Sequence, residues 1–391
     1  MPTVTIGFSP RERFSLAAES LQRIFDHTHI PFNLIVVDCN TPKVYWQQIE
    51  QILQGRENVK VIHRDHYLLP NQSRNLVVQE AQDEFLCLIE NDNLVSDGWL
   101  TQLITACEEY PADVAVPLLM EGRSRKAPVH FDDRLNQVHS VQTSEGIKLK
   151  ILPRTDDKET DRGQELRKVQ FMEQHCLLFR RNVFDRIGLY DEELNTRDEI
   201  DLSLALYSAG VPVVFEPKCE INYLPPYPPS PEDEEYFLMK WDMDRAHKSH
   251  ERIQKKWNLL RMPGSIEFVK DRRRIAQLSK VKEELKTLVG PDVPFILVDQ
   301  ARWLGTEIVD GLQPIPFLEK DGQYWGEPAD DETAIRELER LRQLGATHIA
   351  FAWHTFWWLE YYSEFHNYLR AKFPCVLSND RLIVFKLEEH L

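Results

Sequence analysis

Two short acidic stretches contain the side chains best suited to chemistry. In the first, Glu90-Asn91-Asp92-Asn93 follows the apolar run FLCLI. Carboxylates at positions i and i+2 of a strand end can share a hard divalent cation, because Mg²⁺ and Mn²⁺ prefer oxygen ligands. Asn and Asp also favour turns. The sequence alone therefore leaves two interpretations of this stretch, a cation site and a turn.

The second acidic stretch is Thr196-Arg197-Asp198-Glu199-Ile200-Asp201, which opens the apolar run LSLALYSAG. Acidic residues suit the first turn of a helix, and Thr196 or Asp198 could cap it. That explanation needs no function. The alternative is that one of these carboxylates is a general base that removes a proton from a substrate.

Arginines in two places could bind an anion. Arg74-Asn75 follows LLPNQS at the expected start of a helix, and Ser9-Pro10-Arg11-Glu12-Arg13 follows the first apolar strand. A guanidinium group can donate two parallel hydrogen bonds to a phosphate. Solvated arginines are the alternative, and the sequence leaves both open.

Several other chemistries lack support. The chain has no GxGxxG after a strand and no GxxxxGK[ST], so dinucleotide and P-loop sites are not predicted. It has no GxSxG elbow and no HExxH among its thirteen histidines. We interpret His175, in MEQHCLLF, as a structural or substrate-lining residue and not as a zinc ligand.

The elements that must position these residues follow an alternating pattern. Apolar runs at 4–8, 33–38, 59–63, 84–92 and 112–119 predict strands, and amphipathic segments at 13–26, 43–54, 73–82 and 99–110 predict helices. This order predicts an α/β fold with a mainly parallel sheet covered on both faces. Ligands of such sheets bind beyond the carboxyl ends of the strands, where Asp38 and residues 90–92 lie.

The rest of the chain is less uniform. Residues 121–170 are polar, and we interpret them as a long loop with a hairpin at 138–152. Strands are expected at 176–181 and 211–217, with helices at 182–187 and 199–209. After the breaker-rich PPYPPSP (225–231), helices are expected at 232–260, 265–288, 331–344 and 357–370, and strands at 295–299, 347–353 and 381–387. We therefore expect three parts: a domain over 1–225, a helical connector over 226–290 and a small α/β domain over 291–391.

Composition narrows the class of protein. The 391 residues include 47 Lys and Arg against 63 Asp and Glu, a net charge of -16, which argues against a broad nucleic-acid-binding or anionic-membrane surface. No apolar run is long enough for a transmembrane segment, and the N-terminus does not look like a signal peptide. The six cysteines form no CxxC, which is typical of reduced thiols. We expect a cytoplasmic protein.

Taken in order, these pieces resemble a family 2 glycosyltransferase of the GT-A (Rossmann-like) fold. The strand and loop VTIGFSPRERF, the strand LIVVD ending in Asp38, and Ser73-Arg74-Asn75 before a helix match that family's order. LCLIENDN stands in the place of its DxD metal motif, and CLLFRRNVFDRIGLYDEELNTRDEIDLSLALYSAGVPVVFEP resembles its acceptor-side segment. The resemblance covers about residues 3–224.

The resemblance implies an inverting, metal-dependent transfer of one sugar from a nucleotide-sugar donor to an acceptor hydroxyl. It implies that Mn²⁺ or Mg²⁺, held by Asp92 and Glu90, stabilises the leaving diphosphate. Glu199 aligns with the family's base, with Asp198 beside it. The residues implied to bind the nucleotide sugar are Pro10, Arg11, Arg13, Asp38, Arg74, Asn75, Asn91 and Asp92.

The chain departs from the family pattern at several points. The DxD motif appears as Glu90-Asn91-Asp92, and the family's ED pair is inverted to Asp198-Glu199. The QxxRW signature of processive synthases is absent, which favours a non-processive hexosyltransferase. Family members often build surface glycans or polysaccharides, so a glycan or lipid-linked acceptor is expected. Peripheral contact with the inner face of a membrane would depend on a partner or on Arg272, Arg273 and Arg274, for which solvent-exposed helix arginines are the alternative.

Two other functions remain open on the sequence. The altered DxD motif and the extra domain are also compatible with a non-catalytic GT-A-like binding or scaffold protein of a glycan assembly system. A nucleotidyltransferase is disfavoured, because SPRERF lacks the glycines and lysine that such enzymes usually carry after the first strand. In the last part of the chain, Trp353, Trp357 and Trp358 could stack on sugar, or they could dock a helix on the sheet.

Overall fold

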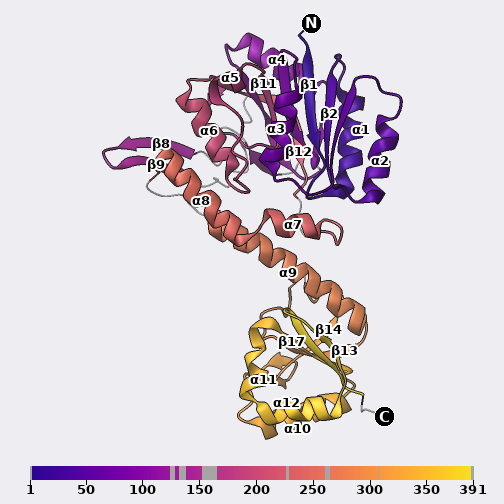
Figure 1. The fold of residues 1–391 in the computed structure, drawn as a ribbon. Coiled ribbons are helices and arrows are strands. Elements are labelled where there is room, and N and C mark those ends of the chain that lie inside the picture. Colours follow the sequence, from indigo (N-terminus) through magenta and orange to yellow (C-terminus); the bar gives the residue numbers. More distant parts are fainter. Residues whose placement is uncertain are drawn as a thin grey trace. The chain divides into compact units, whose positions relative to one another are not determined.

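The computed structural model describes residues 2–123, 128–131, 138–151, 165–225, 229–259, 265–306 and 308–388. The chain divides into two compact units, Met1–Arg273 and Arg274–Leu391. Each unit has its own sheet (Figure 1). The boundary predicted near residue 225 stays a prediction.

Unit 1 is built on a ten-stranded mixed sheet in the order β10-β12-β6-β11-β4-β1-β2-β3, with β5 on β12 and β7 on β6. Four pairs of these strands, β1–β2, β2–β3, β1–β4 and β6–β12, are parallel. Strand β11 runs antiparallel to β4 and β6. The eight strands along the path are β1 Val4–Ser9, β2 Asn33–Cys39, β3 Val59–Arg64, β4 Phe85–Glu90, β6 Val114–Glu121, β10 Arg167–Val169, β11 Cys176–Arg180 and β12 Val213–Tyr223. The predicted fold class, a mixed and mainly parallel α/β sheet, is confirmed.

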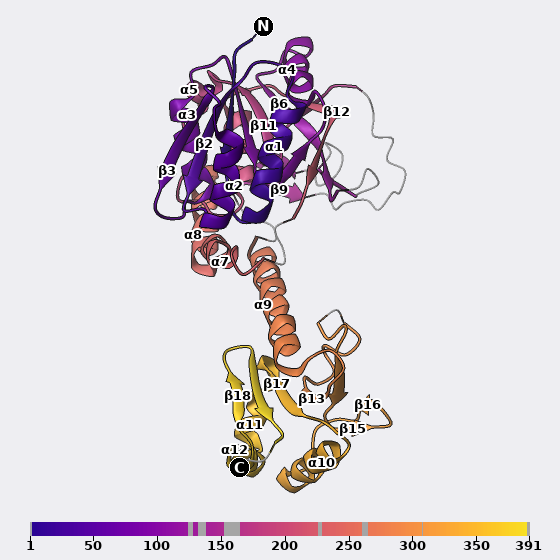
Figure 2. The same ribbon diagram turned by 90° about the vertical axis from the view of Figure 1, so that its right-hand side faces the viewer.

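Helices cover this sheet because its central strands are apolar on both faces. Every residue of β1 is buried, and so is every residue of β2 after its first. The helices of this layer are α1 Ala17–His27, α2 Lys43–Leu53, α3 Pro70–Glu80, α4 Trp99–Glu109, α5 Val183–Ile187 and α6 Asp198–Ser208. Helices α1 and α2 lie side by side (Figure 2). In α1, Ala17, Leu21 and Ile24 are spaced at about one helical turn and are fully buried, which is the amphipathic pattern the sequence predicted.

A glycine lets α3 approach the central strand. A Cβ atom on Gly7 of β1 would lie 2.4 Å from Cγ1 of Val77, which is on α3. No side chain fits in that space. The close packing fixes the height of α3 above the sheet, and with it the position of Arg74, three residues before Val77.

The polar region after β6 differs from the expected loop. The predicted hairpin is confirmed as β8 Val138–Thr143 and β9 Gly146–Ile151. However, β7 Val129–Phe131 and β10 Arg167–Val169 join the main sheet, as does β5 Asn93–Val95 earlier in the chain. These strands are three residues long, too short to show a period in the sequence. The remaining parts of 121–170, at 124–127, 132–137 and 152–164, lie outside the described residues.

The helical stretch predicted over 232–260 consists of two helices, α7 Glu234–Lys240 and α8 Met243–Trp257, with a break at 241–242. The helix predicted over 265–288 is confirmed as α9 Ser265–Val289. Helix α7 is held to unit 1 by the buried Tyr236, whose hydroxyl donates to the carbonyl of Leu68 over 3.0 Å. Helix α8 is held by Asp201 of α6, which accepts from Lys256 and from the indole of Trp257. Asp201 therefore has a structural role in the docking of α8.

Unit 2 contains a five-stranded sheet in the order β14-β13-β17-β19-β18. Its strands are β13 Pro294–Val298, β14 Gln313–Pro316, β17 His348–Ala352, β18 Cys375–Ser378 and β19 Leu382–Lys386, with a small pair β15 Glu319–Lys320 and β16 Gln323–Tyr324. Its helices are α10 Asp331–Gln343, α11 Trp357–Tyr361 and α12 Ser363–Lys372. Trp358 is fully buried beside Phe317 and Tyr362, which agrees with helix docking. Among the described helices, none is long and apolar enough to cross a bilayer.

Candidate active site

The predicted acidic residues gather at one edge of the unit 1 sheet. Strands β1, β2 and β4 are parallel, so their carboxyl ends meet at the same edge. Asp38 lies near the end of β2, Glu90 ends β4, and the loop Pro10–Arg13 follows β1. The topology thus explains why residues spread over eighty positions of sequence come together.

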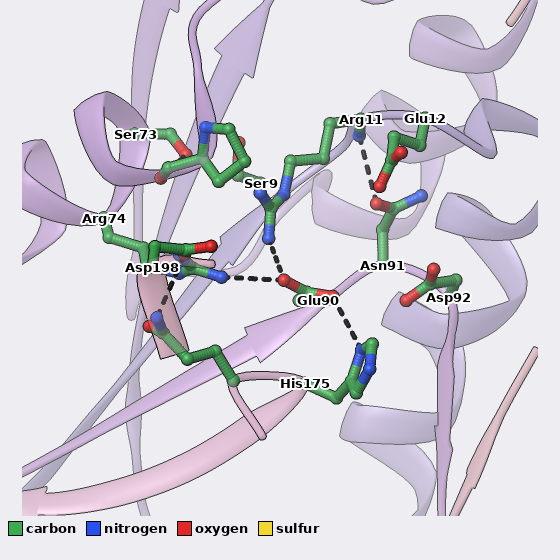
Figure 3. Close-up of polar contacts among 12 residues, drawn as sticks. Ser9, Arg11, Glu12, Ser73, Arg74, Glu90, Asn91, Asp92, His175 and Asp198 are labelled. Atoms are coloured by element: carbon green, nitrogen blue, oxygen red, sulfur yellow. Dashed lines mark hydrogen bonds and ion pairs between the residues drawn. The ribbon is translucent and has the colours of Figure 1, made fainter. Parts of the chain in front are cut away.

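Glu90 is the centre of a buried ion cluster (Figure 3). Its Oε1 accepts from Nη2 of Arg74 over 2.8 Å and also from Arg11. Nδ1 of His175 lies 2.9 Å from its Oε2. Burial raises the pKa of Glu90, but the charges of Arg11 and His175 outweigh it and hold that pKa well below its usual range. Glu90 is therefore ionised, with the guanidinium groups of Arg11 and Arg74 as its cationic partners.

The same contact raises the pKa of His175. Burial lowers the pKa of His175, while the carboxylate of Glu90 raises it and prevails. His175 immediately precedes β11, the strand that pairs antiparallel with β4, and this register brings it opposite Glu90. His175 also lies in the wall of the cavity described below, and its role stays a prediction.

The two acids at the start of α6 have different surroundings. Oδ2 of Asp198 accepts from Nη1 of Arg74 and, over 3.0 Å, from Nε2 of Gln174. Glu199 has a weaker partner, Nη1 of Arg197 at 3.3 Å. Burial raises the pKa of Glu199 to about 7, against the opposing charge of Arg197. Glu199 therefore has the acid strength that suits a base working near neutral pH.

Asp92 is buried beside Glu90. Its Oδ1 accepts from Nδ2 of Asn93 over 3.2 Å. Burial raises the pKa of Asp92 to about 7, and the nearby charge of Glu90 adds to the effect. Ligand atoms of Glu90, Asp92 and His175 all lie within 4.8 Å of one another. These donors fit a divalent cation, whose charge would favour the ionised form of Asp92.

The other predicted donor-binding residues hold loops in place. Asn91 accepts from the backbone N–H of Arg11 over 3.0 Å and donates to the carbonyl of Arg13 over 2.9 Å. Nη1 of Arg13 donates to the carbonyl of Pro225 over 2.7 Å. Pro10 is buried at the start of this loop. Donor binding by these residues stays a prediction.

Asp38 and Asn75 make contacts with other parts of unit 1. Asp38 accepts from the backbone N–H of Thr41 over 3.0 Å, and Nδ1 of His63 lies 3.0 Å from its other oxygen. The amide of Asn75 donates to the carbonyl of Tyr190 and to Glu192, and it accepts from the backbone N–H of Tyr190. Asn75 thus fixes the segment before α6, and contact with a nucleotide sugar stays a prediction for both residues.

A cavity of about 190 Å³ opens over these acids. Arg74, Glu90, Asp198 and Glu199 line it, whereas Pro10, Arg11, Arg13, Asp38, Asn75, Asn91 and Asp92 do not. Its lining also contains residues that sequence reasoning did not single out, namely Glu12, His130, Glu173, Gln174, Lys240, Trp241 and Phe268. Trp241, Lys240 and Phe268 follow the proline-rich segment, so no motif of the first 225 residues signals them.

Glu12 connects the loop after β1 to this later region. Its carboxylate accepts from Nζ of Lys240 over 2.6 Å and from the indole N–H of Trp241 over 2.9 Å. Arg272, also in the cavity wall, lies with its guanidinium carbon 4.5 Å from the ring centre of Phe268. Arg273 donates to the carbonyl of Trp241 over 3.2 Å. Arg272 and Arg273 thus belong to unit 1 and contact other residues of that unit.

Comparison with known proteins confirms the predicted resemblance. Residues 12–188 match the model of the family "Glycosyl transferase family 2". The curated "Pre-mycofactocin glycosyltransferase" of Mycobacterium tuberculosis is 23% identical over 163 residues, which are 41% of this chain and 31% of that relative. The chain thus matches less than a third of the relative's length.

Two solved structures are similar to this chain at low sequence identity. The crystal structure of GalNAc-T7 with UDP, GalNAc and Mn²⁺ has a TM-score of 0.47 and 16% identity, and it covers 74% of this chain and 58% of that one. The structure of S. aureus TarS 1-349 with UDP-GlcNAc has a TM-score of 0.44 and 14% identity, with 73% of this chain and 81% of that one covered.

Proposed function

We propose that this chain is an inverting, metal-dependent, non-processive hexosyltransferase that moves one sugar from a nucleotide-sugar donor to an acceptor hydroxyl. The observation that carries the proposal is Glu199, a nearly buried carboxylate with a pKa of about 7 in the wall of the cavity that also contains Glu90 and Asp198. A base of that strength takes a hydroxyl proton most effectively near neutral pH. The family match over residues 12–188 supports the same reaction class.

The donor would bind along the edge of the sheet. Asp38 would accept hydrogen bonds from the base, while Arg11 and Arg74 would face the diphosphate. Asp92, Glu90 and His175 would hold a divalent cation, Mn²⁺ or Mg²⁺, which when bound supplies charge neutralisation for the leaving diphosphate. Both arginines pair with Glu90, which would position their guanidinium groups for the phosphate.

Acceptor activation is assigned to Glu199. Asp198 already accepts from Arg74 and Gln174, so it is engaged in orienting the cluster. Glu199 would take the proton of the acceptor hydroxyl while that oxygen attacks the anomeric carbon, and the nucleoside diphosphate would leave from the opposite side. One such displacement inverts the configuration of the anomeric carbon.

The acceptor would enter beside Trp241 and Phe268, whose aromatic rings suit the apolar face of a sugar. A glycan or lipid-linked acceptor of surface glycan biosynthesis fits this wall, with the protein in the cytoplasm and, for a lipid-linked acceptor, peripheral at the inner face of the membrane. In this proposal residues 226–290 connect the catalytic domain to an accessory domain over 291–391.

One observation favours a second candidate, a non-catalytic sugar-nucleotide-binding or scaffold protein. Glu90 stands in the first position of the metal motif, but Arg11 and Arg74 neutralise it, and His175 contacts its other oxygen. If those contacts persist when donor is present, Glu90 would not be available to a cation and catalysis would be weak.

The test compares wild type with Glu199→Gln. Calorimetric titration with a panel of UDP- and GDP-sugars, with and without Mn²⁺, identifies the donor, and release of nucleoside diphosphate reports turnover. We expect both proteins to bind the donor and only wild type to turn it over. Binding without turnover in wild type would favour the scaffold candidate, and no binding of any donor would overturn both.

A further inference from the structure

Beside the ion cluster lies a second group of side chains suited to a metal. His130, Glu173 and His175 each offer a ligand atom, and these atoms all lie within 4.8 Å of one another. His130 comes from β7, while Glu173 and His175 come from the segment that leads into β11. All three are partly exposed and line the cavity, so an ion could reach them from solvent.

Both imidazole rings are oriented by a carboxylate behind them. Nδ1 of His130 lies 3.2 Å from Oε2 of Glu121, and Nδ1 of His175 lies 2.9 Å from Oε2 of Glu90. A histidine that donates from Nδ1 carries its lone pair on Nε2. Histidines that bind metals almost always donate their other ring N–H to a carboxylate, a carbonyl or water. These two contacts are therefore the support that a pair of Nε2 ligands requires.

A third side chain fixes the planes of the two rings. The ring centre of Tyr223 lies 4.6 Å from that of His130 and 3.9 Å from that of His175, and the two imidazoles are 5.1 Å apart. Ordered rings lose less conformational entropy when they bind an ion. The site is thus built from β7 and the segment that leads into β11, with Tyr223 of β12 against both rings, and it is positioned before any ion arrives.

We propose that His130, Glu173 and His175 bind a divalent transition-metal ion of the imidazole-preferring class, such as Zn²⁺ or Co²⁺. Two imidazoles and one carboxylate are a ligand set that holds Zn²⁺ with one position left for water or substrate. Mg²⁺ prefers oxygen ligands only, so this group differs in metal preference from an all-carboxylate motif. The ion would be held in the cavity wall by Nε2 atoms, with Glu90 and Glu121 as orienting carboxylates.

This inference does not depend on the proposed sugar transfer, because the ion would bind in the absence of donor. It does compete with the grouping of Glu90, Asp92 and His175, since His175 belongs to both. The two arrangements differ in the second imidazole, which only the proposed site uses. His130 and Asp92 are therefore the residues that distinguish them.

The experiment titrates Co²⁺ into the full chain after treatment with a chelator and follows the visible absorption of the bound ion. We expect one Co²⁺ per chain, displaced by Zn²⁺. Glu121→Gln should weaken binding by about 10- to 100-fold, as loss of an orienting carboxylate does in other sites, and His130→Ala should weaken it further. The control His66→Ala removes an exposed histidine that also contacts an aspartate, and it should bind Co²⁺ as wild type does.

Asp92→Asn separates the two arrangements, and it should leave the Co²⁺ spectrum unchanged. Loss of the spectrum in Asp92→Asn together with its retention in His130→Ala would overturn the proposal. Should His130→Ala fail to fold, X-ray absorption of the Zn²⁺-loaded wild type still decides, because two imidazoles at about 2.0–2.1 Å are expected. An oxygen-only shell would overturn the proposal whatever the protein's transferase activity.

Discussion

Nη2 of Arg74 donates to Oε1 of Glu90 over 2.8 Å, and the two side chains are only 8% and 13% exposed. Arg74 comes from α3 and Glu90 from the end of β4. Because Nη1 of the same guanidinium donates to Asp198 on α6, one cation ties together the two acidic stretches that the sequence marked as candidate metal and base sites.

Replacing Arg74 by Met should therefore destabilise the protein. The change removes a cation from two buried carboxylates, and breaking a buried ion pair typically costs about 3–5 kcal/mol. Glu90 retains its contacts with Arg11 and His175. We therefore expect the free energy of unfolding, measured by urea denaturation, to fall by about 3 kcal/mol. Arg123→Met is the control, because Arg123 and Glu19 form an exposed pair, and its loss should stay below about 1 kcal/mol. Equal losses in the two variants would show that burial of the Arg74 pair has no effect.

Substitutions of the two acids of α6, Asp198 and Glu199, should lower kcat to different extents. Glu199→Gln removes the proposed base and should lower kcat by about 10²- to 10⁴-fold while donor affinity is kept. Asp198→Asn keeps Glu199 but weakens the contact with Arg74, so it should lower unfolding stability and reduce kcat by less. Single-turnover measurements with saturating donor make the comparison. A larger fall of kcat in Asp198→Asn than in Glu199→Gln would move the base to Asp198.

The raised pKa of Glu199 also predicts how activity depends on pH. A general base must be ionised, so kcat/KM should rise as pH increases and level off above pH about 7. Asp92 has a raised pKa of about 7 as well, and its ionisation should strengthen cation binding over the same range. Saturating Mn²⁺ should shift the part of the profile due to Asp92 to lower pH and leave the Glu199 part in place. A profile that is flat from pH 5 to about 8 would contradict the assignment of the base.

The raised pKa of Glu199 also predicts how the free energy of unfolding depends on pH. Glu199 has its pKa raised on folding, from an ordinary value of 4.5 to about 7, so the folded state binds more protons than the unfolded state between those values. The free energy of unfolding should therefore fall as pH rises through this window, by on the order of 2–3 kcal/mol from this group. Glu199→Gln removes that contribution, and urea denaturation at pH 4.5 and about 8 measures it. An identical fall in the variant and in wild type would place the titrating group elsewhere.

The parts of the fold that the sequence predicted have strong periodic patterns. Strands β1, β2 and β4 are mostly apolar, and their alternation with amphipathic helices implies parallel pairing. That pairing alone brings Asp38 and Glu90 to one edge of the sheet. The three-residue strands β5, β7 and β10 were missed, because they form only where a longer strand offers a free edge.

The sequence predicted fewer features of the site than of the fold. Arg74, Glu90 and Asp198 were named separately, but nothing in their spacing shows that one guanidinium joins the other two. Trp241 and Phe268 come from helices beyond the proline-rich segment, and their place in the cavity depends on the docking of α7 and α9. His130 lies in a stretch without a motif, and only the register of β7 on β6 brings it near His175.

Substitutions at Gly7 and Val77 test whether the packing of α3 against β1 holds Arg74 in position. A Cβ at Gly7 would lie 2.4 Å from Cγ1 of Val77 and 3.0 Å from Cδ2 of Leu88, so Gly7→Ala should cost about 1–3 kcal/mol by overpacking. Val77→Ala removes the clashing methyl groups and leaves space that the new Cβ can use. The double variant should then be more stable than the sum of the two single changes predicts, with a coupling of about 0.5–3 kcal/mol. Additive losses would mean that α3 shifts freely over β1, and that Arg74 is held in place by its carboxylates alone.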